Sequence, residues 1–239
     1  MKRALMGFAA VVIASLWVGC GKPEDPVAPV GPSAPDTMEM VHDYVDLGLP
    51  NGTLWATCNV GGDSPEDEGD FFSWGEIAPK EVFGWKYYQY GSFIDEHYEF
   101  TKYCSDSVYG LDGFVDDLIM LEPADDVAAT VWGSGWRMPT KKEWEELFEN
   151  TVGEWSELEG VEGWLLTAPN GNTLFLPAVG YWWNDIHNDE GLGIYWSSTL
   201  NTEFPYRAWG FHFNMYSAHI CGSSDRCRGQ VVRAVRSPM

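Results

Sequence analysis

The start of a helix is predicted by the stretch Gly135-Trp136-Arg137-Met138-Pro139-Thr140-Lys141-Lys142-Glu143-Trp144. Thr140 is a favoured N-cap residue, and Glu143 follows three positions later. The pair forms a capping box, in which each side chain binds the backbone amide of the other residue. An apolar face at helical spacing follows, made of Trp144, Leu147 and Phe148. We therefore expect a capped amphipathic helix over residues 140–150.

Strands and tight turns surround this helix. A turn sequence, Pro50-Asn51-Gly52-Thr53, separates two strand-like runs and predicts a hairpin. A second hairpin is expected around Pro169-Asn170-Gly171-Asn172. The expected strands are 44–49, 54–58, 163–168, 173–178, 193–199, 208–213 and 229–236, with a short helix at 125–132. Residues 84–125 show no sustained period and are expected to form long aromatic-rich loops. The fold class predicted is α+β, with one or two helices packed on short antiparallel hairpins.

Five motifs stand in a characteristic order along the chain. They are Tyr44–Gly61 (YVDLGLPNGTLWATCNVG), Trp136–Thr140 with Trp144, Phe175–Tyr181 (FLPAVGY), Tyr195–Thr199 (YWSST) and Val232–Arg236 (VRAVR). In this order they resemble the Fibrobacter major paralogous domain family, which is common in Bacteroidetes surface lipoproteins. The resemblance covers nearly all of residues 43–237. It implies a C-type-lectin-like fold, related to the formylglycine-generating sulfatase-modifying domains, and no particular reaction. In such a fold Arg137, Trp144, Arg233 and Arg236 are expected to be scaffold.

The amino terminus has the pattern of an export signal. Lys2 and Arg3 precede an apolar core that is too short for a conventional spanning helix. The run Leu16-Trp17-Val18-Gly19-Cys20 resembles a bacterial lipobox, in which the cysteine is acylated and becomes the first residue. We therefore expect a lipoprotein signal peptide over 1–19, lipid attachment at Cys20, a proline-rich tether over 20–40 and one domain over 41–239.

The charged residues at the start of the tether predict where the protein is located. Lys22-Pro23-Glu24-Asp25 directly after the cysteine is similar to the export signal of surface-exposed Bacteroidetes lipoproteins. The expected localisation is the outer membrane, lipid-anchored and facing outward.

The chain is strongly acidic, with a formal net charge of −22. Removing residues 1–19 takes away Lys2 and Arg3 and leaves −24. Phosphate binding needs a basic footprint, so a nucleic-acid partner is not expected. Most of the acid is interpreted as a solvated surface.

Four cysteines follow Cys20, and an even number in an exported chain permits two disulfides with three connectivities. Cys221 with Cys227 is the expected local staple, which leaves Cys58 with Cys104. Free buried thiols are the alternative.

Two motifs are similar to functional sites of related folds. Trp183-Asn184-Asp185 matches the short calcium motif of C-type lectins, but the partner Glu-Pro-Asn triplet is absent. Cys221 and Cys227 are similar to the copper-binding cysteines of formylglycine-generating oxidases, but the rest of that signature is absent. No zinc spacing, nucleophile elbow or phosphate loop occurs in the sequence. We expect no enzyme activity and no bound metal or cofactor, with calcium as the alternative.

A ligand-binding surface is the favoured function. It is expected on the 182–190 loop and the 201–219 segment, where amphipathic side chains are frequent. In residues 208–213 the alternation places Trp209, Phe211 and Phe213 on one face and His212 on the other. The predicted ligand-binding residues are Trp182, Trp183, Asn184, Asp185, Asn201, Tyr206, His212, Asn214 and Tyr216. A glycan is favoured over a surface protein, because Trp and Tyr rings beside acids and amides suit sugars.

Other classes remain open from the sequence. They are an oxidase-like enzyme using Cys221 and Cys227, and a structural envelope or fimbria-associated component. A third is a target protein of a diversity-generating retroelement, since residues 199–228 resemble the diversified region of such proteins. An adenine-rich template repeat beside the gene would support that hypothesis.

Overall fold

The computed structural model describes residues 42–133, 135–189 and 191–238, apart from the side chains of residues 218–221. The chain divides into Met1–Glu39 and one compact unit, Met40–Met239, and the described residues belong to the second. The expected signal peptide over 1–19, Cys20 and the whole of the tether over 20–40 therefore lie outside the described part of the chain. None of the described helices is long and apolar enough to cross a membrane.

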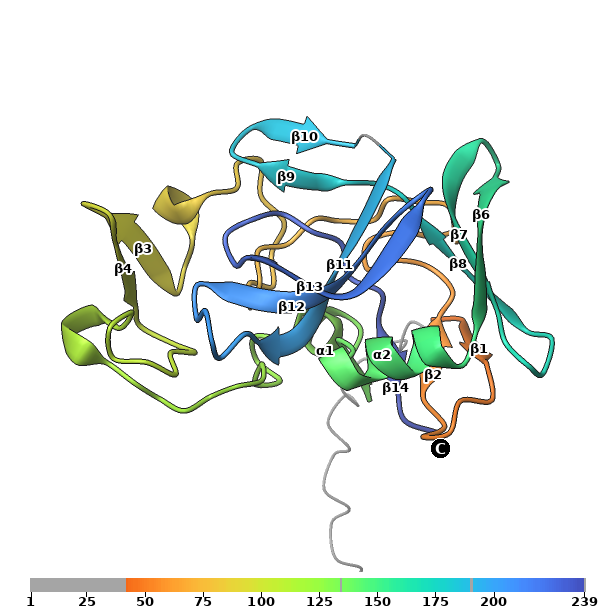
Figure 1. Cartoon of the computed structure of the whole chain (residues 1–239), viewed down its shortest axis with the longest axis horizontal. Coiled ribbons are helices and arrows are strands. Elements are labelled where there is room, and N and C mark those ends of the chain that lie inside the picture. The colour runs from red at the N-terminus through yellow and green to blue at the C-terminus, as the bar shows by residue number, and fades with distance from the viewer. Residues whose placement is uncertain (1–41, 134, 190, 239) are drawn as a thin grey trace, which may run out of the picture. The chain divides into compact units, whose positions relative to one another are not determined.

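Short antiparallel sheets make up most of this unit (Figure 1). One sheet has the order β1 (Tyr44–Asp46), β2 (Leu54–Ala56), β14 (Val235–Arg236), β5 (Trp136–Arg137). A second sheet has the order β6 (Val152–Leu158), β7 (Val161–Thr167), β8 (Thr173–Pro177). A third sheet has the order β11 (Leu192–Leu200), β12 (Arg207–Asn214), β13 (Ser217–Asp225). Two hairpins are separate, β3 (Gly91–Ile94) with β4 (His97–Phe100), and β9 (Tyr181–Trp183) with β10 (Ile186–Asn188).

Helices are few in the described residues. They are the α-helices α1 (Val127–Val131) and α2 (Lys141–Glu149) and the single 3₁₀ turns η1 (Trp85–Tyr87) and η2 (Leu111–Gly113). The predicted combination of few helices with antiparallel hairpins is confirmed, and strand predominates over helix.

Helix α2 begins as predicted. The amide of Glu143 donates to Thr140 Oγ1 at 3.2 Å, and the amide of Thr140 donates to Glu143 Oε2 at 2.8 Å, which completes the capping box. The apolar face packs on the β11–β12–β13 sheet, which lies directly above α2 in Figure 1. There the Trp144 ring stacks on Phe211 with centroids 5.0 Å apart, and its Nε1 donates to the Trp196 carbonyl.

The alternation predicted for β12 explains this packing. Trp209 lies against Lys141 of α2, whose Nζ is 3.9 Å from the ring centroid, and Phe211 and Phe213 are buried in the same core cluster as Trp144 and Tyr195. His212 and Asn214 on the opposite face are half-buried. The face assignment made from the sequence is therefore confirmed.

Several elements differ from the sequence-based expectation. Residues 84–125, expected as loops, contain the β3–β4 hairpin, and the acidic stretch 154–162, for which no strand was expected, forms most of β6 and the turn into β7. The expected final strand 229–236 shortens to β14. Its earlier part makes only single bridges, from Gly229 to Trp182, from Gln230 to Phe72 and from Val231 to Tyr195, because it crosses between sheets rather than along one.

The expected pairing of Cys58 with Cys104 is not made. Both are buried free thiols, and they lie in different hydrophobic clusters. Burial raises the pKa of both thiols. Cys227 is a buried free thiol as well, while the side chain of Cys221 lies outside the described residues.

Candidate ligand-binding site

The predicted ligand-binding surface does not form one continuous area. Tyr206 directly precedes β12 and Tyr216 follows its other end. Eight strand residues at about 3.3 Å each separate the two rings by roughly 25 Å along the strand. The 201–219 segment therefore contributes to two distinct regions of the surface.

At the far end of β12 the predicted residues mainly form a turn. Asn214 Oδ1 accepts hydrogen bonds from the amides of Tyr216 and Ser217, which closes the β12–β13 connection. The His212 ring packs directly over Gly222, where a Cβ atom would come within 2.1 Å of Nδ1. Tyr216 is 86% exposed at the tip and packs little.

The Trp183-Asn184-Asp185 motif lies at the turn of the β9–β10 hairpin, where Trp183 ends β9 and Asn184 and Asp185 connect it to β10. Asn184 has a positive φ of 54°, a conformation that asparagine tolerates, and its backbone pairs with Phe83. Trp182 stacks on His187 at 4.7 Å and packs against the first core cluster. Asp185 is exposed in the turn. No group of three or more His, Cys, Asp or Glu side chains suited to a metal ion occurs in the described part of the chain.

Asn201 is a positioning residue for the loop before β12. It is 3% exposed, and its Oδ1 accepts from the amides of Glu203 and Phe204. The side chain therefore shapes the 201–206 loop from within, and it is Phe204 and Tyr206 that this loop presents at the surface.

Two predicted residues, Trp183 and Tyr206, do come to the same region. Both pack against the third hydrophobic cluster, around Tyr88 and Phe100. Together with their neighbours they form a half-exposed group that we call the arginine-aromatic cluster: Tyr98, Trp183, Tyr206, Arg207, Asp225 and Arg228. It brings together β4, β9, the start of β12 and the end of β13.

An ion pair across two strands lies at the centre of this cluster. Arg207 and Asp225 are direct partners in the β12–β13 register. Arg207 Nε donates to Asp225 Oδ1 at 3.3 Å, and Arg228 Nη2 lies 3.7 Å from Asp225 Oδ2. One carboxylate therefore has an arginine on each side.

Each arginine lies over an aromatic ring. The Arg207 Cζ is 5.3 Å from the centroid of Tyr206, and the Arg228 Cζ is 5.0 Å from the centroids of both Tyr181 and Trp183. Arg228 is held there by the backbone, because Gly229 and Trp182 exchange hydrogen bonds in both directions. The rings thereby orient both guanidinium groups.

Tyr98 extends the aromatic surface away from the arginines. Its ring is parallel to that of Tyr206, at 4.6 Å and 3°, and is 5.2 Å from Trp85. Burial, with a contribution from the charge of Asp225, raises the pKa of Tyr98 to about 12. The phenol therefore stays protonated at physiological pH and remains a hydrogen-bond donor.

A pocket of about 320 Å³ continues from this aromatic surface. It is lined by Trp85, Lys86, Tyr88 and residues 91–94. Phe93, 43% exposed, lies at its wall and contacts Tyr98 with centroids 4.7 Å apart. The aromatic surface thus ends in a recess that contains a lysine and a serine.

Beneath the cluster, Arg226 is fully buried and fixes its base. Its Nη1 donates to the Tyr103 carbonyl at 2.7 Å, and its Cζ is 4.0 Å from the Phe100 centroid. Burial lowers the pKa of Arg226, although a guanidinium keeps its charge in proteins. This residue ties the end of β13 to the loop after β4, so both sides of the cluster are rigidly connected.

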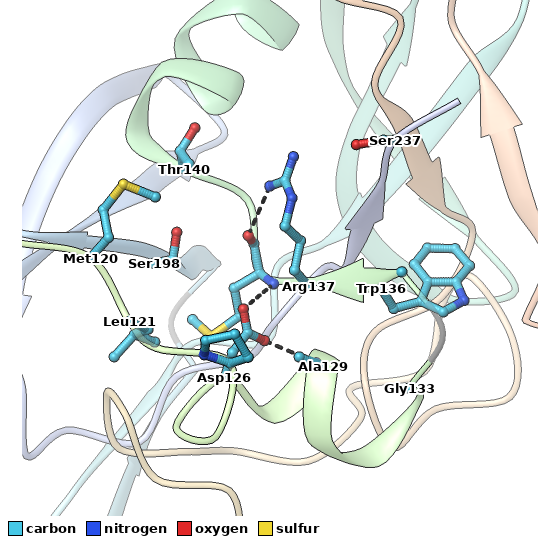
Figure 2. Close-up of a pocket in the computed structure, with 13 residues that line it drawn as sticks. Met120, Leu121, Asp126, Ala129, Gly133, Trp136, Arg137, Thr140, Ser198 and Ser237 are labelled. Atoms are coloured by element: carbon cyan, nitrogen blue, oxygen red, sulfur yellow. Dashed lines mark hydrogen bonds between the residues drawn. The ribbon is translucent and has the colours of Figure 1, made fainter. Parts of the chain in front are cut away.

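A larger pocket, about 650 Å³, opens beside α1, β5 and the start of α2 (Figure 2). Its charged groups already have protein partners. Asp126 accepts from the amide of Ala129, as Figure 2 shows, and from the amide of Met138. Arg137 is held by Glu143 and the Met138 carbonyl. A pocket whose charges are satisfied internally offers a ligand little polar recognition. The arginine-aromatic cluster is therefore the stronger candidate.

The sequence predicted Trp183 and Tyr206 as ligand-binding residues and placed Arg207 within the expected 201–219 segment, but it did not point to Tyr98, Asp225 or Arg228. Arg228 and Trp183 are 45 positions apart and Tyr98 is more than 100 positions from Tyr206, so no local pattern connects them. The only local signal is the Asp225–Arg228 spacing, where a turn joins the amide of Arg228 to the Asp225 carbonyl.

No model of a known protein family, no curated protein and no solved structure matches this chain.

Proposed function

We propose that this protein is an outer-membrane lipoprotein, anchored through Cys20, whose domain binds a glycan at the arginine-aromatic cluster. In this proposal the domain is C-type-lectin-like and related to the Fibrobacter major paralogous domain family. The order of sequence motifs supports the relationship, and the few helices on short antiparallel sheets are compatible with it.

The observation that carries the proposal is the row of half-exposed aromatic rings. Trp183, Tyr206 and Tyr98 pack on a buried base and keep part of each ring accessible. Sugar rings present apolar faces that stack on such aromatic groups, while their hydroxyls need nearby donors and acceptors. Arg207, Asp225 and Arg228 supply both within the same cluster.

The side chains that could act as nucleophiles have structural hydrogen bonds or a raised pKa, and this supports binding without catalysis. Ser197 Oγ donates to the Trp209 carbonyl at 2.8 Å and Ser198 Oγ to the Pro139 carbonyl at 3.4 Å, so both hydroxyls serve the scaffold. Burial raises the pKa of the Cys227 thiol, which disfavours the thiolate that an oxidase-like reaction at Cys221 and Cys227 needs.

The experiment is a glycan panel probed with the purified full chain, with and without EDTA. We expect specific binding that survives EDTA, and a loss of at least about tenfold in affinity for Tyr206→Ala, on the scale of one stacked aromatic contact. Loss of binding in EDTA would instead assign the recognition to calcium at Trp183-Asn184-Asp185. A panel with no binding would exclude the glycan function and favour a protein receptor or a structural role.

A further inference from the structure

The arginine-aromatic cluster carries a local excess of positive charge. Arg207 and Arg228 face one carboxylate, Asp225, so the cluster has two cations and one anion. This is unusual for a chain with 14 Lys and Arg against 36 Asp and Glu. The acidic residues nearest in sequence to Trp183 and Tyr206 are Asp185 and Glu203, which are both exposed and form no ion pair with Arg207 or Arg228.

Both guanidinium groups keep unused hydrogen-bond donors. Arg207 contacts Asp225 through Nε alone, and its side chain is 42% exposed. Arg228 approaches Asp225 only to 3.7 Å, and its Nε is buried without a hydrogen-bond partner among the described residues. A guanidinium has five N–H donors in a rigid planar fork, so the Nη donors of both side chains that Asp225 does not take remain for a ligand, while the buried Arg228 Nε is not among them.

The overall negative charge does not cancel this local charge. At physiological ionic strength charges are screened beyond about 8 Å, so a bound group senses mainly the cluster itself. Contacts between an ionised ligand group and two oriented guanidinium groups are the strong class of hydrogen bond. The aromatic rings beneath the arginines exclude water from one side of the cluster, which strengthens these electrostatic contacts further.

We propose that the cluster binds an acidic glycan, with the carboxylate of a uronic-acid residue accepting from the guanidinium donors of Arg207 and Arg228 that Asp225 does not occupy, and the adjoining sugar ring on Tyr206 or Trp183. This assignment rests on the proposed glycan-binding function and names its ligand class. A planar carboxylate matches the planar fork of each guanidinium, which gives the site its selectivity for that group.

The test compares three probes on the full chain by titration calorimetry: oligogalacturonate, the same oligosaccharide after reduction of its carboxyl groups, and a sulfated oligosaccharide of neutral sugars. We expect oligogalacturonate to bind at least about tenfold more tightly than the reduced form, and its affinity to fall as NaCl is raised. Arg207→Gln and Arg228→Gln are each expected to lose about tenfold for oligogalacturonate and to leave the reduced form unaffected.

Matched variants make the result specific. Lys142→Gln removes the same charge from an exposed position on α2 and should not change binding, whereas Glu203→Gln removes a nearby acid and should strengthen it. Arg207→Lys keeps the charge without the fork and should recover only part of the affinity. Thermal unfolding of each variant identifies any that lose the fold. If Arg228→Gln does not fold, the Arg207 variants alone decide the test, because Arg207 is the more exposed of the two arginines.

Three results would overturn the inference, and they are distinguishable. Equal binding of the acidic and reduced probes, unaffected by Arg207→Gln, would reject the carboxylate and leave glycan binding standing. Preference for the sulfated probe would assign the arginines to sulfate. Binding to none of the three, nor to the wider panel, would reject the proposed function itself.

Discussion

Two buried arginines show how single residues hold this protein together. Arg233 and Arg226 are 0% exposed, and in the described residues neither forms an ion pair with a carboxylate. Arg233 instead donates to Asn59 Oδ1 at 2.9 Å and to the carbonyls of Ala56 and Thr57. Hydrogen bonds to backbone carbonyls replace the missing counter-charge, so each arginine joins segments distant in sequence.

Replacing Arg233 by methionine is expected to destabilise the fold by roughly 3 kcal/mol, because two buried acceptors and one half-buried acceptor lose their donor. Arg236, three positions later, offers a control. It lies over Trp136 and Tyr44 without a hydrogen bond from its side chain among the described residues, so Arg236→Met should change stability by less than about 1 kcal/mol. Urea unfolding of both variants measures the difference, and equal losses would contradict this account.

Glu143 links stability to pH. Burial opposes its charge, but hydrogen bonds from Arg137 and from Thr140 outweigh burial and lower its pKa below the ordinary value of 4.5. A carboxyl group with a lowered folded-state pKa stabilises the protein above its unfolded-state pKa. That stabilisation is lost as the pH falls through the folded-state value.

We therefore expect Glu143→Gln to lower the free energy of unfolding by roughly 1–3 kcal/mol at pH 7 and by much less at pH 3. Urea unfolding at the two pH values checks this, with the exposed Glu149→Gln as the control. An equal deficit at both pH values would show that the Glu143 charge does not contribute.

At the scale of elements, the two-residue hairpin turns differ in how well their sequences fit. The β6–β7 turn, Glu159-Gly160, places a glycine at the second positive φ, as such turns prefer. The β3–β4 turn has Asp95 and Glu96 at φ of 49° and 65°, with no glycine. The β3–β4 turn is therefore strained at Glu96.

Glu96→Gly is expected to stabilise the protein by about 1 kcal/mol, because glycine adopts this backbone conformation without a steric penalty. The melting temperature should rise by roughly 2–4 °C for a domain of this size. The reverse change in the other hairpin, Gly160→Glu, should lower it by a similar amount. A lower melting temperature for Glu96→Gly would contradict the turn geometry.

The same turns explain which elements the sequence predicts. Pro50-Asn51-Gly52-Thr53 and Pro169-Asn170-Gly171-Asn172 carry strong turn chemistry, and both hairpins are found where expected. Asp95-Glu96 carries none, so β3–β4 is missed. The capping box at Thr140 is a local interaction and is predicted correctly, whereas the contact of Arg228 with Trp183 depends on how β9 and the segment after β13 lie together.

The whole molecule combines a strongly acidic sequence with one cluster that carries an excess of positive charge. The buried aromatic and arginine side chains beneath this cluster make it rigid, so a ligand would meet an already formed surface. At the opposite end of β12, Tyr216 is 86% exposed and makes no ring contact with another described side chain. The central claim is therefore that recognition occurs at Trp183 and Tyr206 rather than at Tyr216.

The most direct test measures the affinity of Trp183→Ala and Tyr216→Ala, side by side with the unaltered full chain, for a glycan that the panel identifies. Both variants remove one accessible aromatic ring, but only Trp183 belongs to the cluster. The account predicts a loss of at least about tenfold for Trp183→Ala and no change for Tyr216→Ala. A loss confined to Tyr216→Ala would contradict it and move the binding site to the tip of the β12–β13 hairpin.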